Sequence, residues 1–116
     1  MASAFEQVAV ALTAVVTDPA QVRSGVPVSL SCEAPDRELL LVDWLNALVY
    51  EMSTQHLLFG RYEVRVDGSR LEGTAWGEPV DLVRHAPAVE VKGATYTALE
   101  VHESNGFWTA QCVVDV

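Results

Sequence analysis

One lysine stands in a stretch of apolar and aromatic residues, although most charged residues of this chain are acidic. The stretch reads EVKGATYTALEV over residues 90–101, and the lysine is Lys92. A lysine ammonium in such a place can reach a phosphate or a carboxylate on a partner molecule. Alternatively, its aliphatic stem packs on Tyr96 while the charged head reaches water. The residues by themselves favour this packing role.

The side chains that usually carry catalysis form no recognisable motif. The sequence has no glycine-rich phosphate loop, no nucleophile elbow and no paired Cys-x-x-Cys or His-x-x-x-His. His56, His85 and His102 are far apart in the sequence, and each is interpreted as a surface or packing residue. Acidic residues are plentiful but dispersed, so none stands out as half of an acid–base pair. We therefore expect that the chain is not an enzyme.

Composition limits the kinds of partner. A length of 116 residues suffices for one domain with its own core, so we expect a single domain over 1–116. Sixteen acidic residues against seven basic ones give a net charge of -9, which disfavours direct nucleic-acid binding. The same charge suits a basic protein partner or a divalent cation, and solubility alone explains it equally well.

The cysteines and the apolar runs indicate the compartment. Cys32 and Cys112 are too few and too far apart for a secreted disulfide framework, so we predict reduced core thiols. No apolar run approaches the roughly 20 residues that span a bilayer. The run VAVALTAVV (8–16) resembles the core of a signal peptide, but no basic residue precedes it. These features predict a cytoplasmic protein without a membrane partner.

Two helices are predicted to position the candidate residues. The first covers about 3–16, where Ser3 and Glu6 fit a capping box. Its apolar residues share one helix face: Phe5, Val8, Ala9, Leu12, Val15 and Val16. The second, within 35–56, starts at the N-cap Asp36 and is apolar around most of its circumference, so it must be covered on several sides. Its polar residues form one narrow stripe: Asp43, Asn46 and Tyr50.

The remaining segments predict strands. VPVSLSCEA (26–34) alternates apolar and small or polar residues, as a strand with one buried face does. Asp67-Gly68 and Asn105-Gly106 are favoured hairpin dipeptides, and strand-like segments flank each of them. Residues 78–91 are interpreted as a loop followed by a strand. The predicted class is α+β, with two main helices packed on an antiparallel-rich sheet.

Three ordered segments resemble the archease family: LLLVDWLNALVYEM (39–52), AWGEPVDLVRHAPAVEVKGATYTALEV (75–101) and WTAQCVVDV (108–116). The resemblance covers nearly the whole chain and implies two nested strand–helix–strand–strand modules. It also implies an accessory protein of the RtcB-type RNA ligase, which joins RNA 3′-phosphate ends to 5′-hydroxyls with GTP in tRNA splicing or RNA repair. Such a protein promotes guanylylation and multiple turnover of the ligase and is not the ligase itself.

The same resemblance assigns site residues. Lys92 corresponds to the lysine of the family segment E-(I/V)-K-A-x-T-Y, which implies a role in partner activation. Asp115 and Val116 correspond to the last two ligands of a divalent cation, typically calcium, whose hard oxygen ligands include carboxylates and carbonyls. A simple solvated carboxylate is the alternative for Asp115. Asp43, in the family segment VDWLN, is interpreted as structural.

The sequence departs from the family pattern at two places. The N-terminal His-Thr-Ala-Asp strand, which supplies the remaining calcium ligand, has no counterpart, and Thr97 replaces the usual histidine. The resemblance therefore implies weak calcium binding. It also implies an exposed strand edge beside the C-terminal strand, through which two chains could pair as a homodimer.

Two other function classes are open. One is a chaperone or binding module for another RNA-processing enzyme, such as a tRNA methyltransferase. The other is a metal-dependent hydrolase, which is poorly supported because neither clustered ligands nor a nucleophile is evident.

Overall fold

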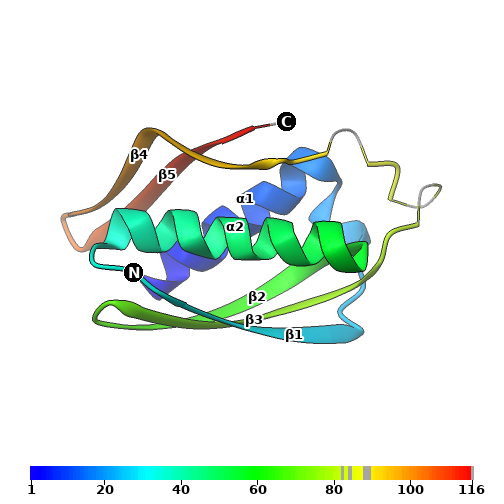
Figure 1. The fold of residues 1–116 in the computed structure, drawn as a ribbon, viewed down its shortest axis with the longest axis horizontal. Helices are drawn as coiled ribbons and strands as arrows, with labels where there is room; N and C mark the ends of the chain where they lie inside the picture. Colours follow the sequence, from blue (N-terminus) through cyan, green and yellow to red (C-terminus); the bar gives the residue numbers. More distant parts are fainter. Residues whose placement is uncertain (82, 84, 88–89, 116) are drawn as a thin grey trace.

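The chain forms three layers, with two helices between two antiparallel sheets (Figure 1). The computed structural model describes residues 1–115 except 82, 84, 88 and 89, and it describes 95–98 by their backbone alone. In chain order, the elements are α1 (Ala2–Val16), the short 3-10 helix η1 (Pro19–Gln21), β1 (Val26–Glu33), α2 (Arg37–Gln55), β2 (Leu57–Asp67), β3 (Arg70–Pro79), β4 (Gly93–Ser104) and β5 (Phe107–Asp115). The predicted α+β class is confirmed.

The two sheets belong to two nested units. Strands β1, β3 and β2 form one sheet in that order, and the β4–β5 hairpin forms the other. The strand–helix–strand–strand unit β1–α2–β2–β3 is inserted between α1 and the β4–β5 hairpin, so the predicted nesting is confirmed. Helix α1 packs on β2 and β5, and α2 packs on β1 and β4. Each helix therefore contacts both sheets.

Helix α2 is the centre of the core. The Asp36 carboxylate accepts a hydrogen bond from the Leu39 N–H at 2.8 Å, so the predicted N-cap is confirmed. Buried residues surround the helix: Leu40, Leu41, Val42, Trp44, Leu45, Leu48 and Val49. The predicted polar stripe is exposed, and the Tyr50 residue is 65% accessible to solvent. A helix this apolar must be covered on several sides, and the two sheets cover it.

Trp44 sets the distance between α2 and the three-stranded sheet. Its residue is fully buried, and its indole N–H donates to the Phe5 carbonyl oxygen at 3.2 Å. Gly73, on the central strand β3, faces this ring, and a Cβ at Gly73 would lie 2.7 Å from two ring carbons. Any side chain at this position would force the tryptophan or the strand to move, so the close approach requires glycine.

The predicted capping box at the start of α1 is wrong. The helix begins at Ala2 with Met1 as its N-cap, and no side chain caps it. The Glu6 carboxylate instead accepts a hydrogen bond from the Val64 N–H at 2.7 Å. Because β2 is an edge strand, this N–H has no neighbouring strand to bond, and the glutamate satisfies it from the helix.

The buried face of α1 differs from the prediction at two residues. Val15 is 41% exposed, whereas Thr13 is fully buried. The Thr13 hydroxyl donates to the Phe59 carbonyl oxygen at 2.7 Å and lies 2.6 Å from the Tyr62 hydroxyl, which donates to it. Hydrophobic periodicity does not identify a polar residue whose hydroxyl is satisfied by distant partners, so this contact was missed.

Both predicted hairpins are present. The Asn105-Gly106 turn has positive φ at both residues, 53° and 81°, as a two-residue hairpin turn of this type requires. The other turn is shifted by one residue: Asp67 still pairs with Arg70, and residues 68–69 form the turn. The strand predicted at the end of 78–91 is not found in its described residues, because Glu90 and Val91 precede β4, and residues 88–89 lie outside the described part.

The predictions about the cysteines and membranes can also be compared with the structure. Cys32 and Cys112 are half-buried thiols at the margin of the core, less enclosed than predicted. Of the helices in the described part of the chain, none has both the length and the apolar character of a membrane span.

We expect Leu45→Ala to lower the free energy of unfolding by about 2–5 kcal/mol, the usual cost of truncating a buried leucine. The Leu45 residue is only 1% exposed, so the lost methyl groups would leave a cavity. Urea unfolding of both proteins measures the difference. Tyr50→Ala, on the exposed stripe of the same helix, is the control and should change stability by less than about 1 kcal/mol. Equal small losses in both variants would contradict the assignment of the core.

Stability should also fall in alkali because of Tyr62. Burial raises the pKa of Tyr62 above its ordinary value of about 10. The unfolded chain loses the phenolic proton that the folded chain keeps. The stabilisation is therefore complete below pH of about 10 and is lost as the pH rises further.

This prediction is tested by urea unfolding of wild type and Tyr62→Phe at pH of about 8 and about 11. The variant should be less stable at the lower pH, by about 1 kcal/mol for the lost hydrogen bond, but should lose less stability on going to the higher pH. Tyr50→Phe, at an exposed position, should behave as wild type. A pH dependence unchanged in Tyr62→Phe would exclude this residue as its source.

Candidate functional site

Two of the predicted site residues are neighbours in the structure. Lys92 immediately precedes β4, and its backbone N–H donates to the Asp115 carbonyl oxygen at 2.7 Å. The next residue, Gly93, pairs with Asp115 in the β4–β5 ladder. Both the Lys92 and Asp115 side chains are exposed. Val116, the third predicted residue, lies outside the described residues. Lys92 and Asp115 thus present an ammonium and a carboxylate at the same end of the hairpin.

The β4–β5 hairpin brings these residues together. Its turn sets the first pair, Ser104 with Phe107, and the strands then run antiparallel to the last pair, Gly93 with Asp115. The register shifts in between: residues 96–99 of β4 lie opposite residue 112 of β5, between the pairs Thr95–Val113 and Glu100–Gln111. Irregular pairing of this kind redirects the strand. The pairs beyond the shift, at 93–95, therefore need support of their own.

Helix α2 supplies contacts at two points along β4. The Arg37 Nε–H donates to the Val101 carbonyl oxygen at 3.0 Å, and the guanidinium lies 5.0 Å from the centre of the Trp108 ring. Further along the helix, the Asn46 side-chain oxygen accepts a hydrogen bond from the Ala94 N–H at 2.8 Å. The strand therefore runs antiparallel to the helix and is bonded to it near both ends of the strand.

The predicted packing of Lys92 on Tyr96 cannot be compared with the structure, because the Tyr96 side chain lies outside its described part. The same holds for Thr97, which stands where the family usually has histidine. The exposed position of Lys92 fits either of its two interpretations. Its backbone anchor to Asp115 is a feature that the sequence did not predict.

The histidines occupy three different environments. His85 is buried, its Nε2 lies 3.1 Å from a Glu78 carboxylate oxygen, and its Nδ1 accepts a hydrogen bond from the Asp81 N–H at 2.8 Å. This pattern places the ring proton on Nε2. The ring thus links Glu78, near the end of β3, to Asp81 in the segment that follows. His56 ends α2 in a left-handed backbone conformation, and the His102 ring lies 2.9 Å from Glu100. These are packing and surface roles.

The thiol of Cys32 is poorly suited to nucleophilic chemistry. Burial raises the pKa of the Cys32 thiol, and the Asp43 carboxylate raises it further. The nucleophilic form of cysteine is the thiolate, which both effects disfavour. Asp43 itself is exposed on α2, and its interpretation as a structural residue stays a prediction.

The described residues fit a calcium site poorly. Among them, no group of three or more His, Cys, Asp or Glu side chains is close enough to hold a metal ion. Calcium takes 6–8 oxygen ligands, and of the two predicted ligands only Asp115 can be placed. The calcium site at Asp115 and Val116 stays a prediction of the family resemblance.

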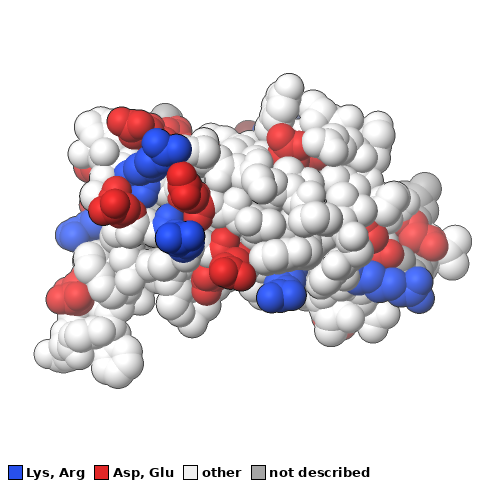
Figure 2. Space-filling view, turned by 90° about the horizontal axis from the view of Figure 1, so that it is seen from below, with Lys and Arg blue, Asp and Glu red and all other residues white. Residues whose placement is uncertain are grey.

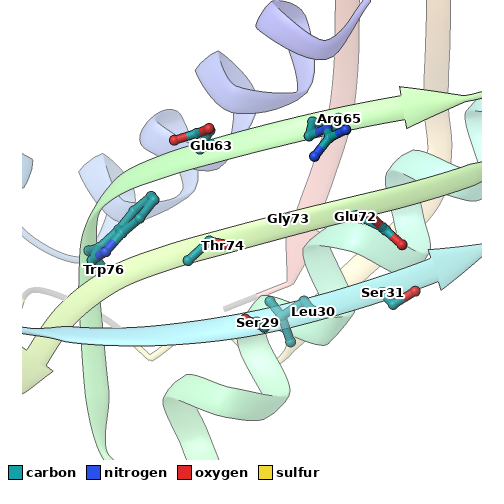
Figure 3. Close-up of a pocket in the computed structure, with 9 residues that line it drawn as sticks. All are labelled: Ser29, Leu30, Ser31, Glu63, Arg65, Glu72, Gly73, Thr74 and Trp76. Carbon is teal, nitrogen blue, oxygen red and sulfur yellow. The ribbon is translucent and has the colours of Figure 1, made fainter.

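A shallow hollow of about 470 Å³ lies on the outer face of the three-stranded sheet (Figure 3). Its lining comes from all three strands: Ser29, Leu30, Ser31, Glu63, Arg65, Glu72, Gly73, Thr74 and Trp76. Acidic and basic side chains are intermixed on this face (Figure 2). Arg70 pairs with Glu72 at 3.1 Å, and the Arg61 guanidinium lies 4.4 Å from the Trp76 ring centre.

This hollow was not predicted, although the sequence contains a signal for it. The outward positions of β1 and β3 hold the small residues Ser29, Ser31 and Thr74, which leave space between the longer side chains around them. Neither histidine nor cysteine is among the nine lining residues, so the serine hydroxyls have no imidazole base beside them in the hollow. The arrangement does not suggest catalysis.

A second hollow, of about 610 Å³, lies at the C-terminal end of α2 and is more apolar. It is lined by Val16, Met52, Ser53, His56, Leu57, Leu58, Val80, Pro87, Glu90 and Val91. Val91, which directly precedes Lys92, belongs to this lining, whereas Lys92 itself does not.

Comparison with known proteins agrees with this geometry. Residues 1–116 match the model of the Archease protein family (MTH1598/TM1083). The chain is 36% identical over 118 residues to the protein archease of Pyrococcus furiosus, an alignment covering 97% of this chain and 83% of that protein. It is 35% identical to the protein archease of Aeropyrum pernix, with 97% and 82% covered.

Solved structures give the same result. The solution structure of Methanobacterium thermoautotrophicum protein 1598 has a TM-score of 0.81 at 29% identity, covering 97% of this chain and 82% of that one. A Thermotoga maritima crystal structure, described as an archease and possible chaperone, has a TM-score of 0.60 and covers 95% and 79%. At 16% identity, the latter shows the fold alone. From the match over its full length and its identity to these relatives, this chain belongs to the archease family.

Proposed function

We propose that this protein is an accessory protein without catalytic activity of its own, which activates an RtcB-type RNA ligase in tRNA splicing or RNA repair. It would promote guanylylation of the ligase and its multiple turnover. The observation that carries the proposal is the backbone hydrogen bond from Lys92 to Asp115 in a chain of the archease family. The proposal thus rests on family membership together with an exposed lysine whose backbone is held in place.

The charge distribution supports a role for Lys92 at a partner's active site. Lys92 is the only lysine of the chain, and it is exposed on a protein with a net charge of -9. Its flexible four-carbon stem can carry the ammonium to a phosphate of GTP or to a carboxylate of the ligase. An enzyme that binds RNA has a basic surface, which an acidic protein approaches favourably. The same charge disfavours direct binding of this protein to RNA.

The apolar hollow that is lined in part by Val91, the residue before Lys92, supports contact with a folded partner. It can take an apolar side chain of the ligase, with Glu90 at its margin available to a basic neighbour of that side chain. Burial of an apolar anchor next to a charged contact is a common arrangement in protein interfaces. Lys92 would then enter the ligase from a fixed direction.

The second candidate is a chaperone or binding module for another RNA-processing enzyme, such as a tRNA methyltransferase. The description of the Thermotoga maritima protein as a possible chaperone keeps this candidate open. The two are distinguished by whether Lys92 matters for ligase turnover or only for the yield of folded partner.

We expect Lys92→Ala to fold normally and to lose most of its ability to stimulate guanylylation of the ligase. The side chain is exposed, so its removal costs little stability, whereas its charge cannot be replaced by a neighbouring lysine. Guanylylation is measured with labelled GTP at equal concentrations of folded protein.

Arg65→Ala is the matched control, since it removes one positive charge from the outer face of the three-stranded sheet. It should stimulate the ligase as wild type does. Full stimulation by Lys92→Ala would return Lys92 to a packing role. Failure of the wild-type protein to stimulate the ligase at all would reject the proposed function itself.

The edge of β5 and the ion site are tested together. We expect calcium to bind with a dissociation constant no lower than about 10⁻⁴ M, because water must supply most of its ligands, and we expect Asp115→Asn to weaken binding further.

Because β5 is an edge strand of a two-stranded sheet, we also expect dimers that form as the protein concentration rises. Calorimetric titration and light scattering measure the two quantities. Tight binding by a strict monomer would contradict both expectations.

A further inference from the structure

The residue that fixes the start of β4 is on helix α2. Asn46 lies on the exposed stripe of the helix, and its side-chain oxygen accepts a hydrogen bond from the Ala94 N–H at 2.8 Å. A Cβ at Gly93 would lie 3.3 Å from the same oxygen, so the amide also sits tightly against the residue that follows Lys92. The Asn46 oxygen therefore bonds the second residue after the lysine and leaves little room for a side chain at the first.

Asn46 has no helix-forming advantage that would explain its presence. In the middle of a helix, asparagine is a poor residue, because its side chain competes for backbone hydrogen bonds. Asn46 is exposed and makes its hydrogen bond to another element. Its amide contributes a contact between layers rather than stability to the helix.

The backbone around Lys92 is held from two sides. On the β5 side, the Lys92 N–H bonds the Asp115 carbonyl oxygen at 2.7 Å. On the helix side, the Ala94 N–H bonds Asn46. These anchors lie two residues apart, and only the three pairs at 93–95 separate them from the shift of register in β4. Without the Asn46 anchor, the segment that carries Lys92 would lose its hydrogen bond to α2, whereas the bond to Asp115 and the burial of Val91 would remain.

We propose that Asn46 is a positioning residue for Lys92: its side-chain oxygen fixes the start of β4 against α2 and so sets the direction in which the ammonium leaves the surface. This inference rests on the proposed function of Lys92 in ligase activation. Misplacement of a reacting group by about 1 Å can lower a rate about a hundredfold. A group that contacts a partner through a flexible stem depends on the backbone beneath it in the same way.

The experiment compares two substitutions of Asn46, one that removes the side-chain oxygen that accepts the Ala94 hydrogen bond and one that keeps it. Asn46→Ala removes the oxygen and places the best helix former in the helix, so the variant should fold. Asn46→Asp keeps an oxygen at nearly the same place. Stimulation of ligase guanylylation should fall about tenfold or more in Asn46→Ala and should be largely retained in Asn46→Asp. Asp43→Ala, one turn earlier on the same stripe, is the control and should stimulate as wild type.

Two further measurements separate positioning from a general structural effect. In the protein alone, amide hydrogen exchange of Ala94 should rise at least about fivefold in Asn46→Ala, while the amides of the α2 core keep their wild-type rates. In a double-mutant cycle, Asn46→Ala should add nothing to the loss caused by Lys92→Ala.

The outcomes distinguish the two proposals. Additive losses in the double mutant, or full stimulation by Asn46→Ala, would overturn the positioning role while leaving ligase activation intact. If wild type does not stimulate the ligase, the proposed function fails, and with it the role of Asn46 in activation. The amide hydrogen exchange of Ala94 then tests only the hydrogen bond from Asn46. If Ala94 exchanged at the same rate in Asn46→Ala as in wild type, that bond would not hold the start of β4 either.

Discussion

The structure depends on covering a helix that is apolar on nearly all sides. Helix α2 has no face that could lie in water except the narrow stripe through Asn46, so one sheet cannot bury it. Two sheets on opposite sides are the solution found here (Figure 1). The contact of Trp44 with Gly73 sets the approach on one side, and the bonds from Arg37 and Asn46 to β4 set it on the other. The candidate site lies at the start of β4, so its position depends on these bonds from α2 to β4.

The sequence predicts those features that depend on neighbours along the chain. The circumference of α2, the N-cap Asp36 and the Asn105-Gly106 turn are local patterns, and the structure confirms all three. Two of the errors concern polar groups whose partners are distant in sequence. Glu6 was assigned to a local cap but bonds Val64, and Thr13 was overlooked because its partner, Phe59, is on another element. Local periodicity carries no information about such partners.

The candidate site shows the same division. Lys92 and Asp115 were singled out through the family resemblance, whereas their contact follows from the register of a hairpin with a shift in the middle. The turn dipeptide predicts the first pair of that hairpin but not the last, since the shift between Thr95 and Glu100 has no evident sequence signature. Asn46 was recognised as part of a polar stripe, and only the structure reveals its bond to Ala94.

The insertion of one unit inside the other has a consequence for synthesis of the chain. Helix α1 leaves the ribosome before both sheets, yet its carboxylate anchor, Glu6 to Val64, spans 58 positions, and its second sheet is made only after the inserted unit. Until β2 has emerged, the apolar face of α1 has no native surface to cover it. Contacts this distant in sequence slow folding and leave apolar surface open to association. The inserted unit, by contrast, contains all strands of its own sheet and can form before the C-terminal hairpin is made.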